Sequence, residues 1–188
     1  MTSTLFKLSL AGALFCACQT DSYHIKGFAR ELQQGDTICF VTDDKPERIL
    51  GQAIVNEGTF SVNGTTDTNL MFRAYLKRMP ECNVAFFLEP GNIALELNLP
   101  PRPSRVSGTM LNNGWQQMND SVQRFGEQLI TLSKDVGITT QDTHRSRLYT
   151  IDSLHRRMSA CIINTARRNH GNALGRYIEE NYKEPEFK

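Results

Sequence analysis

The sequence predicts an α+β protein, in which an N-terminal antiparallel β-sandwich-like domain is followed by an α-helical hairpin and a short third helix. Two observations support this fold class. In residues 23–106, apolar and polar residues alternate in short runs separated by turn-forming residues, as in β-strands. After residue 112, apolar residues recur every three or four positions, as in amphipathic helices. We therefore expect a β-rich domain over residues 23–108 and a helical extension over residues 109–188.

Turn-forming residues separate the predicted strands. A turn at residues 34–36 joins the runs YHIKGFA and TICFVT. We predict one hairpin that turns at residues 56–58, where Gly58 can adopt the positive φ that a tight loop needs. A second hairpin is predicted to turn at residues 89–92. Short strands at this spacing favour a sandwich or a barrel-like sheet. The prolines that close the region are Pro100, Pro101 and Pro103.

Apolar stripes predict the helices. The stripe of the first helix consists of Trp115, Met118, Val122, Phe125, Leu129 and Leu132. Gly137 is suited to cap its C-terminus. The second helix is expected to begin near Asp142, and its stripe consists of Leu148, Ile151, Leu154, Met158, Cys161 and Thr165. Residues 169–182 predict a shorter third helix. We interpret the stripes as core, with the first two helices packed as an antiparallel pair and the helices docked on one end or edge of the sheet.

The first seventeen residues have the features of an export signal. Lys7 makes the start positively charged, and residues 8–17 then contain no charged residue. Ten residues match the core of a signal peptide, whereas a membrane-spanning helix needs roughly 20. The alternative is a buried first helix. We favour the signal because the run has no polar face.

The end of this apolar run resembles a bacterial lipoprotein signal, in which a small residue precedes the cysteine that is lipidated. Ala17 and Cys18 match these two positions, whereas Phe15 and Cys16 depart from the usual residues. The resemblance implies that Cys18 becomes the lipid-bearing first residue. Residues 18–22 would then form a tether like those of Bacteroidetes-type surface lipoproteins. We expect a cell-envelope protein anchored by lipid to the outer membrane, on its periplasmic or surface face.

Four short motifs of the β region resemble a known family. They are the opening Ile-Lys-Gly strand at 25–27, EGTFSVNG at 57–64, FFLEPGNI at 86–93 and VSGTMLNN at 106–113. They resemble a domain of unknown function, of the 4369 type, at the N-terminus of Bacteroidetes-type lipoproteins related to thiol–disulfide oxidoreductases and peroxiredoxin-like proteins. In such proteins a thioredoxin-like domain usually follows the helices, and we expect this chain to lack it. The resemblance implies a fold and a compartment, and no known reaction.

No motif for redox, metal or hydrolase catalysis stands out. The five cysteines include no Cys-x-x-Cys pair, which a thioredoxin-type mechanism would need. Outside the signal, Cys39, Cys82 and Cys161 are interpreted as small buried residues, although an exported domain could oxidise two of them. The histidines lack the spacing of metal ligands on a helix, and no Gly-x-Ser-x-Gly elbow is present. The histidines are His24, His144, His155 and His170. We expect no metal, no cofactor and no enzymatic activity.

Charge is nearly balanced over the chain, with a formal net charge of +1, so no bulk field favours nucleic acid. Basic residues nevertheless gather in residues 142–176, where seven arginines fall among two acids, Asp142 and Asp152. We favour a solvated helix face. The alternative is a face for an anionic partner, such as lipid headgroups, acidic glycans or another protein. That face would consist of Arg145, Arg156, Arg157, Arg167 and Arg168.

The leading functional hypothesis is a non-catalytic, lipid-anchored binding or interaction module of the cell envelope. Its partners would be the membrane, through the N-terminal lipid, and an envelope protein, but not nucleic acid. The alternative is the N-terminal remnant or regulatory half of a thiol–disulfide oxidoreductase lipoprotein whose catalytic thioredoxin domain is missing or encoded separately. A third hypothesis is a hydrolase with an unrecognised site.

Overall fold

The computed structural model describes residues 21–44, 47–134 and 141–182. Within these ranges, eight strands precede three helices, and the α+β class with two sandwich-like sheets is confirmed. The strands are β1 (Ser22–Phe28), β2 (Thr37–Thr42), β3 (Ile49–Ile54), β4 (Thr59–Thr65), β5 (Met71–Leu76), β6 (Met79–Phe87), β7 (Gly91–Glu96) and β8 (Arg105–Ser107). The helices are α1 (Met110–Lys134), α2 (Gln141–Arg168) and α3 (Ala173–Asn181). The predicted signal segment, Cys18 and Gly137 lie outside the described residues.

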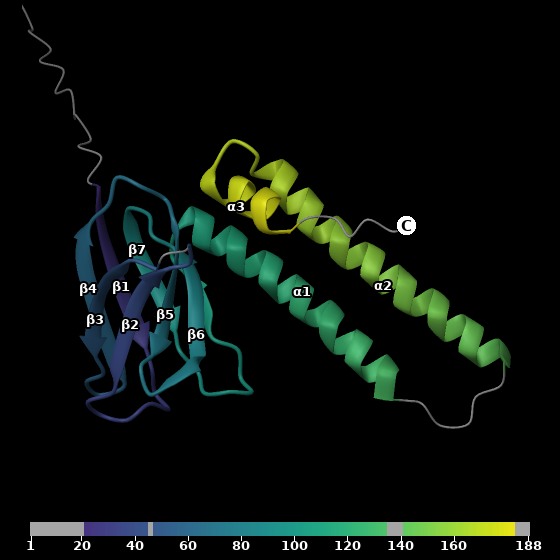
Figure 1. The fold of residues 1–188 in the computed structure, drawn as a ribbon, viewed down its shortest axis with the longest axis horizontal. Coiled ribbons are helices and arrows are strands. Elements are labelled where there is room, and N and C mark those ends of the chain that lie inside the picture. The colour runs from purple at the N-terminus through teal and green to yellow at the C-terminus, as the bar shows by residue number, and fades with distance from the viewer. Residues whose placement is uncertain (1–20, 45–46, 135–140, 183–188) are drawn as a thin grey trace, which may run out of the picture.

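The two sheets have the strand orders β4-β1-β7-β8 and β3-β2-β5-β6, and the core lies between them (Figure 1). The rings of Phe40 on β2 and Phe60 on β4 lie 6.0 Å apart, so this contact joins the two sheets. Gly27 on β1 pairs with Phe60, and a Cβ atom at this glycine would collide with the Phe60 ring. The Ile-Lys-Gly motif of the opening strand is therefore explained by an aromatic ring that takes the place of a side chain.

Both predicted hairpins are wrong. β3 and β4, on either side of residues 56–58, belong to different sheets, and so do β6 and β7. At the first corner, Asn56 and Thr59 exchange backbone hydrogen bonds of 2.8 and 2.9 Å, but pairing stops after this bridge. β4 pairs instead with β1, and β3 pairs with β2. The turn at residues 56–58 is correctly located. In both connections, however, the chain crosses from one sheet to the other, which places the apolar faces of the flanking strands on opposite sides of one core.

A hairpin that the sequence analysis missed joins β5 to β6. Leu76 pairs with Met79, which leaves Lys77 and Arg78 as its two turn residues. Neither is a residue that favours tight turns, so no local signal marked the position. Arg78 donates two hydrogen bonds to the carboxylate of Asp36, at 2.7 and 2.9 Å. This ion pair connects the turn to the loop that precedes β2.

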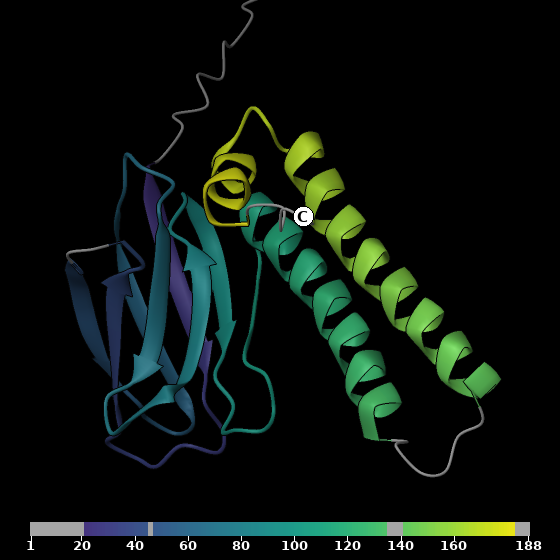
Figure 2. The same ribbon diagram turned by 45° about the vertical axis from the view of Figure 1, so that its right-hand side comes forward.

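The first turns of α1 pack against β6 and β8, the edge strands of the two sheets (Figure 2). Docking of the helices on an edge of the sandwich is therefore confirmed. Trp115 is buried here, and its indole N–H donates to the carbonyl oxygen of Ala85 at 3.2 Å. Its ring meets Phe87 and Tyr177 edge-on, with centroid distances of 6.3 and 5.6 Å. The start of α1 thus completes the core at the side where the two sheets end.

A buried set of polar contacts fixes the start of α1, and we call it the α1 junction. The side-chain oxygen of Asn112 accepts the backbone N–H of Phe87 at 2.8 Å, and its amide donates to the carbonyl of Phe87 at 2.8 Å. The same amide donates to the hydroxyl of Thr109 at 2.8 Å. Glu89 Oε1 accepts the N–H groups of Leu111 and Asn112 at 3.0 and 3.3 Å. A carboxylate is favourable there because the first N–H groups of a helix lack internal partners.

α3 attaches the far end of α2 to the sandwich. Asn172 caps the helix, and its side chain accepts the N–H of Gly175 at 3.2 Å. The hydroxyl of Tyr177 donates to Asp43 Oδ2 at 2.7 Å, and its ring contacts Phe87 at 5.9 Å between centroids. Burial raises the pKa of Tyr177, and the hydrogen bond to Asp43 raises it further. The helical part is therefore attached to the sandwich at two points, the start of α1 and α3.

The distal part of the hairpin extends away from the sandwich (Figure 2). Sixteen residues separate Met118 from Lys134, the last residue of α1, which corresponds to roughly 24 Å of helix. The α1 stripe residues in this part, Val122, Phe125, Leu129 and Leu132, are only half-buried. On α2, Leu154 is buried but Leu148 is 53% exposed. The interpretation of both stripes as core is therefore too broad: Leu154 is buried and Val122 packs against the core, whereas Leu148 is mostly exposed.

Replacing Asn112 by alanine should destabilise the whole protein, because both backbone groups of Phe87 would lose their buried partner. The expected loss of unfolding free energy is roughly 3 kcal/mol, since each buried group left unsatisfied costs about 1–3 kcal/mol. Asn119→Ala, at a half-buried position on the same helix, is the matched control and should change stability by less than about 0.5 kcal/mol. Urea denaturation monitored by circular dichroism measures both. Equal effects of the two substitutions would contradict the role of the α1 junction.

The contact between Tyr177 and Asp43 should make stability depend on alkaline pH. The pKa of Tyr177 in the folded protein lies above its ordinary value of 10.0, so the stabilisation is complete below pH 10 and is lost as the pH rises towards the folded pKa. We expect the unfolding free energy of Tyr177→Phe to decline less steeply above pH 10 than that of the wild type. Some decline should remain, because burial also raises the pKa values of Tyr23 and Tyr182. Identical slopes in urea denaturation at pH 9 to 11 would refute this prediction.

Candidate functional site

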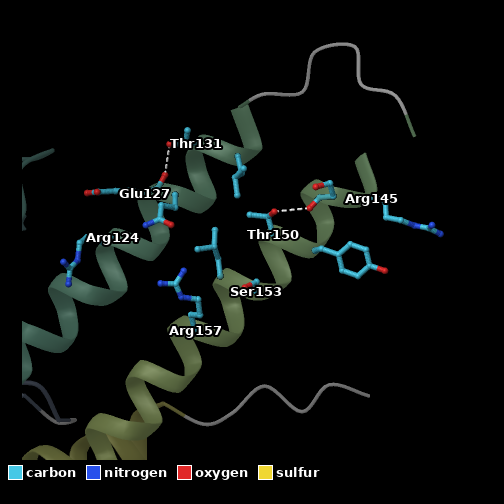
Figure 3. A pocket seen from close by; sticks show the side chains of 12 residues that line it. Arg124, Glu127, Thr131, Arg145, Thr150, Ser153 and Arg157 are labelled. Carbon is cyan, nitrogen blue, oxygen red and sulfur yellow. Dashed lines mark hydrogen bonds between the residues drawn. The ribbon is translucent and has the colours of Figure 1, made fainter. Parts of the chain in front are cut away.

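A groove with a volume of about 950 Å³ lies between the distal halves of α1 and α2 (Figure 3). Local helix periodicity brings its residues together. Arg145, Tyr149, Ser153 and Arg157 follow one another at intervals of four, so they share one face of α2. The α1 side contributes Arg124, Glu127, Gln128, Thr131 and Leu132. The remaining lining residues of α2 are Ser146, Thr150 and Leu154.

The groove combines apolar surface with basic side chains. Arg157 reaches between the two helices (Figure 3), and its guanidinium lies 5.3 Å from the centroid of the Phe125 ring, which is a cation–π geometry. Arg124 donates to the carbonyl of Asp120 at 3.2 Å. Arg145 points away from α1 at the outer end of the groove (Figure 3). These three arginines, which we call the groove arginines, surround a lining with one acidic residue, Glu127.

None of the ion pairs between described residues involves a groove arginine. The single acid of the lining, Glu127, accepts a hydrogen bond from Gln123 on its own helix at 2.8 Å. Arg145 and Arg157 therefore keep guanidinium N–H groups available for an added acceptor, whereas Arg124 donates two hydrogen bonds within α1, to the carbonyl of Asp120 and to Ser121 Oγ. Arginine suits this role because its planar head can donate two parallel hydrogen bonds to one carboxylate.

The five arginines of the predicted anionic-partner face do not lie together. Arg145 and Arg157 line the groove. Arg156 instead pairs with Asp152 at 2.9 Å. Arg167 and Arg168 occupy the last turn of α2, at the other end of the helix, where Arg168 donates to the carbonyl of Asn164 at 3.2 Å.

Arg124 and Tyr149 are among the groove residues that were missed from the sequence. Arg124 belongs to α1 and was not considered with the arginines of α2. Tyr149 is 69% exposed and lies outside the predicted α2 stripe. The i, i+4 series from Arg145 to Arg157 was the available signal for Tyr149. Arg124 had no comparable signal, because its position depends on how the two helices align.

The thiols of the described residues are separated and unpaired. Cys39, Cys82 and Cys161 are all free, and the interpretation of Cys39 and Cys82 as buried residues is confirmed. Cys39 pairs with Tyr75, and Tyr75 pairs with Asn83, so Cys82 points to the opposite face of the sheet from Cys39. Burial raises the pKa of the Cys82 thiol, which disfavours the reactive thiolate.

Among residues 21–44, 47–134 and 141–182, no group of three or more His, Cys, Asp or Glu side chains is arranged to hold a metal ion. No helix in the same ranges has both the length and the apolar character that a membrane crossing requires.

Comparison with known proteins identifies the β part of the chain. No curated protein matches the sequence. The model of the family described as "Domain of unknown function (DUF4369)" matches residues 23–115. The matched part includes the sandwich, the α1 junction and Trp115, and it ends before the distal hairpin. Residues 23–115 are therefore a domain of unknown function of the DUF4369 type.

Proposed function

We propose that this protein is a non-catalytic, lipid-anchored interaction module of the cell envelope, which uses its helical hairpin to bind a protein partner. The observation that carries the proposal is the half-covered apolar stripe of the distal hairpin, next to the groove arginines. Two apolar side chains of the groove lining are incompletely covered there: Tyr149 is 69% exposed and Leu132 is half-buried. Apolar residues gathered at the surface and rimmed by polar residues are typical of interaction sites.

The chemistry of the groove supports binding rather than catalysis. General acid–base catalysis works best with a group whose pKa lies near the working pH, most often histidine. The described lining residues of the groove include no histidine and no cysteine. They offer apolar contact area, hydroxyls and guanidinium groups, all of which can hold a ligand without reacting with it.

The lipid anchor is supported by the charged start, the short apolar run and the Ala17-Cys18 pair. Two or more acyl chains hold a protein stably at a membrane, whereas a single chain gives marginal binding. Cys18 is separated from Ser22, the first residue of β1, by a tether that spans at most about 14 Å. A lipid at Cys18 would therefore keep the start of β1 close to the membrane.

The orientation of the hairpin is consistent with this anchoring. β1 begins at the end of the sandwich from which α1 starts, and the distal hairpin points away from that end (Figures 1 and 2). An anchored molecule would thus hold the groove at a distance from the lipid surface. This arrangement suits a protein partner in the envelope better than the membrane itself.

Mass spectrometry of the membrane fraction should detect a mature chain that begins with acylated Cys18. Cys18→Ser should move the protein out of the membrane fraction, because no lipid would be attached. Cys16→Ser is the matched control and should remain in the membrane fraction, since this residue leaves with the signal. Soluble wild-type protein that retains Met1 would contradict the anchor.

A further inference from the structure

We infer that the groove binds an acidic amphipathic helix of a partner protein, which packs along α1 and α2 as a third helix. The inference rests on the proposed function, because it takes the distal hairpin as the interaction surface. It goes further in naming the chemistry and the secondary structure of the partner segment.

The dimensions of the groove fit a helix of a few turns. On α2 the lining extends from Arg145 to Arg157, which corresponds to roughly 18 Å of helix. A partner helix of about 12–15 residues covers this length. Its apolar residues, spaced at i, i+3, i+4 and i+7, would lie against the uncovered apolar surface of the hairpin.

The coverage of the apolar stripes indicates that a helix is missing from this part of the molecule. Near the sandwich, Trp115 and Met118 are buried because α1 contacts strands as well as helices. Farther along, Phe125, Leu129 and Leu132 remain half-buried, and Leu132 lines the groove. A third helix in the groove would cover apolar surface of the distal hairpin, as the strands cover that of α1 near the sandwich.

Charge complementarity selects an acidic partner. The groove arginines outnumber the single glutamate of the lining, and none of them is engaged in an ion pair with a described residue. Arg157 is held in place by its contact with Phe125, so little side-chain freedom is lost when it binds a carboxylate. Glutamate or aspartate residues on both flanks of the partner's apolar stripe would reach Arg124 on one side and Arg157 on the other.

Two other occupants fit the same groove less well. A second copy of this chain would bring its own groove arginines against those of the first, and like charges repel. An anionic membrane would attract the arginines, but the distal hairpin points away from the end where β1 begins (Figures 1 and 2). Both alternatives are outcomes of the experiment below.

The test uses the purified full chain and a fluorescent 18-residue peptide. The peptide carries leucines at i, i+3, i+4 and i+7 with glutamates on both flanks, and a second peptide has lysine in place of each glutamate. Fluorescence anisotropy at 150 mM salt should show that the acidic peptide binds at least tenfold more tightly than the lysine peptide. Binding should weaken as salt is raised, because exposed charges are screened.

Substitutions assign the binding to the groove. Arg145→Glu combined with Arg157→Glu should weaken the binding of the acidic peptide at least tenfold. Arg156→Glu is the matched control, because Arg156 lies one residue from Arg157, pairs with Asp152 and does not line the groove. It should change the affinity by less than about twofold. Circular dichroism and urea denaturation verify that the variants fold, and Arg124→Glu provides a second groove variant on the other helix.

Several outcomes would overturn the inference. They are equal binding of both peptides, equal losses in the groove and control variants, or no binding of the acidic peptide. Binding to phosphatidylglycerol vesicles that the groove substitutions abolish would assign the groove to a membrane. Self-association in sedimentation that the same substitutions abolish would assign it to a second copy. None of these results depends on whether Cys18 is lipidated, so failure of the anchor and failure of the groove are distinguished.

Discussion

The hydrogen bonds between the side chain of Asn112 and the backbone of Phe87 fix the position of everything that follows the sandwich. They replace a strand neighbour at the end of β6, and Glu89 completes the junction by accepting the first N–H groups of α1. Because α1 is continuous over 25 residues, the direction of its first turn determines the direction of the hairpin. α3 returns to the same region through Tyr177, so the two ends of the helical part are attached to one side of the sandwich.

This attachment divides the hairpin into two environments. Near the junction, Trp115 contacts the sandwich and is buried with the core. In the distal half, backbone hydrogen bonds are satisfied within each helix, so the helices can extend without the sandwich. Their apolar stripes nevertheless remain half-covered, since one helix can cover only part of another. Arginine side chains around these stripes combine apolar stems with charged heads, which suits a surface that is exposed in water and is covered by a partner.

Periodicity in the sequence predicts the class of fold, the strands of the sandwich and the three helices, because these depend on local patterns of apolar residues. It does not predict which strands become neighbours: the turn at residues 56–58 is real, yet β3 and β4 pair with β2 and β1 instead of each other. Asn112 could not be recognised, because its partner Phe87 lies 25 residues earlier in the chain. The groove was predictable only in part, since Arg145 and Arg157 share a helix face, whereas Arg124 joins them through the alignment of two helices.

Native-state hydrogen exchange tests most directly whether the sandwich supports the near half of the hairpin and leaves the distal half uncovered. Amides in the first turns of α1, around Trp115, should exchange only through global unfolding, as should those of β6. Amides from Arg124 to Lys134 should exchange through local opening of clearly lower free energy, because few core contacts oppose it. Uniform protection along the whole of α1 would contradict the account, since it would mean that the distal hairpin is already as well packed as the core.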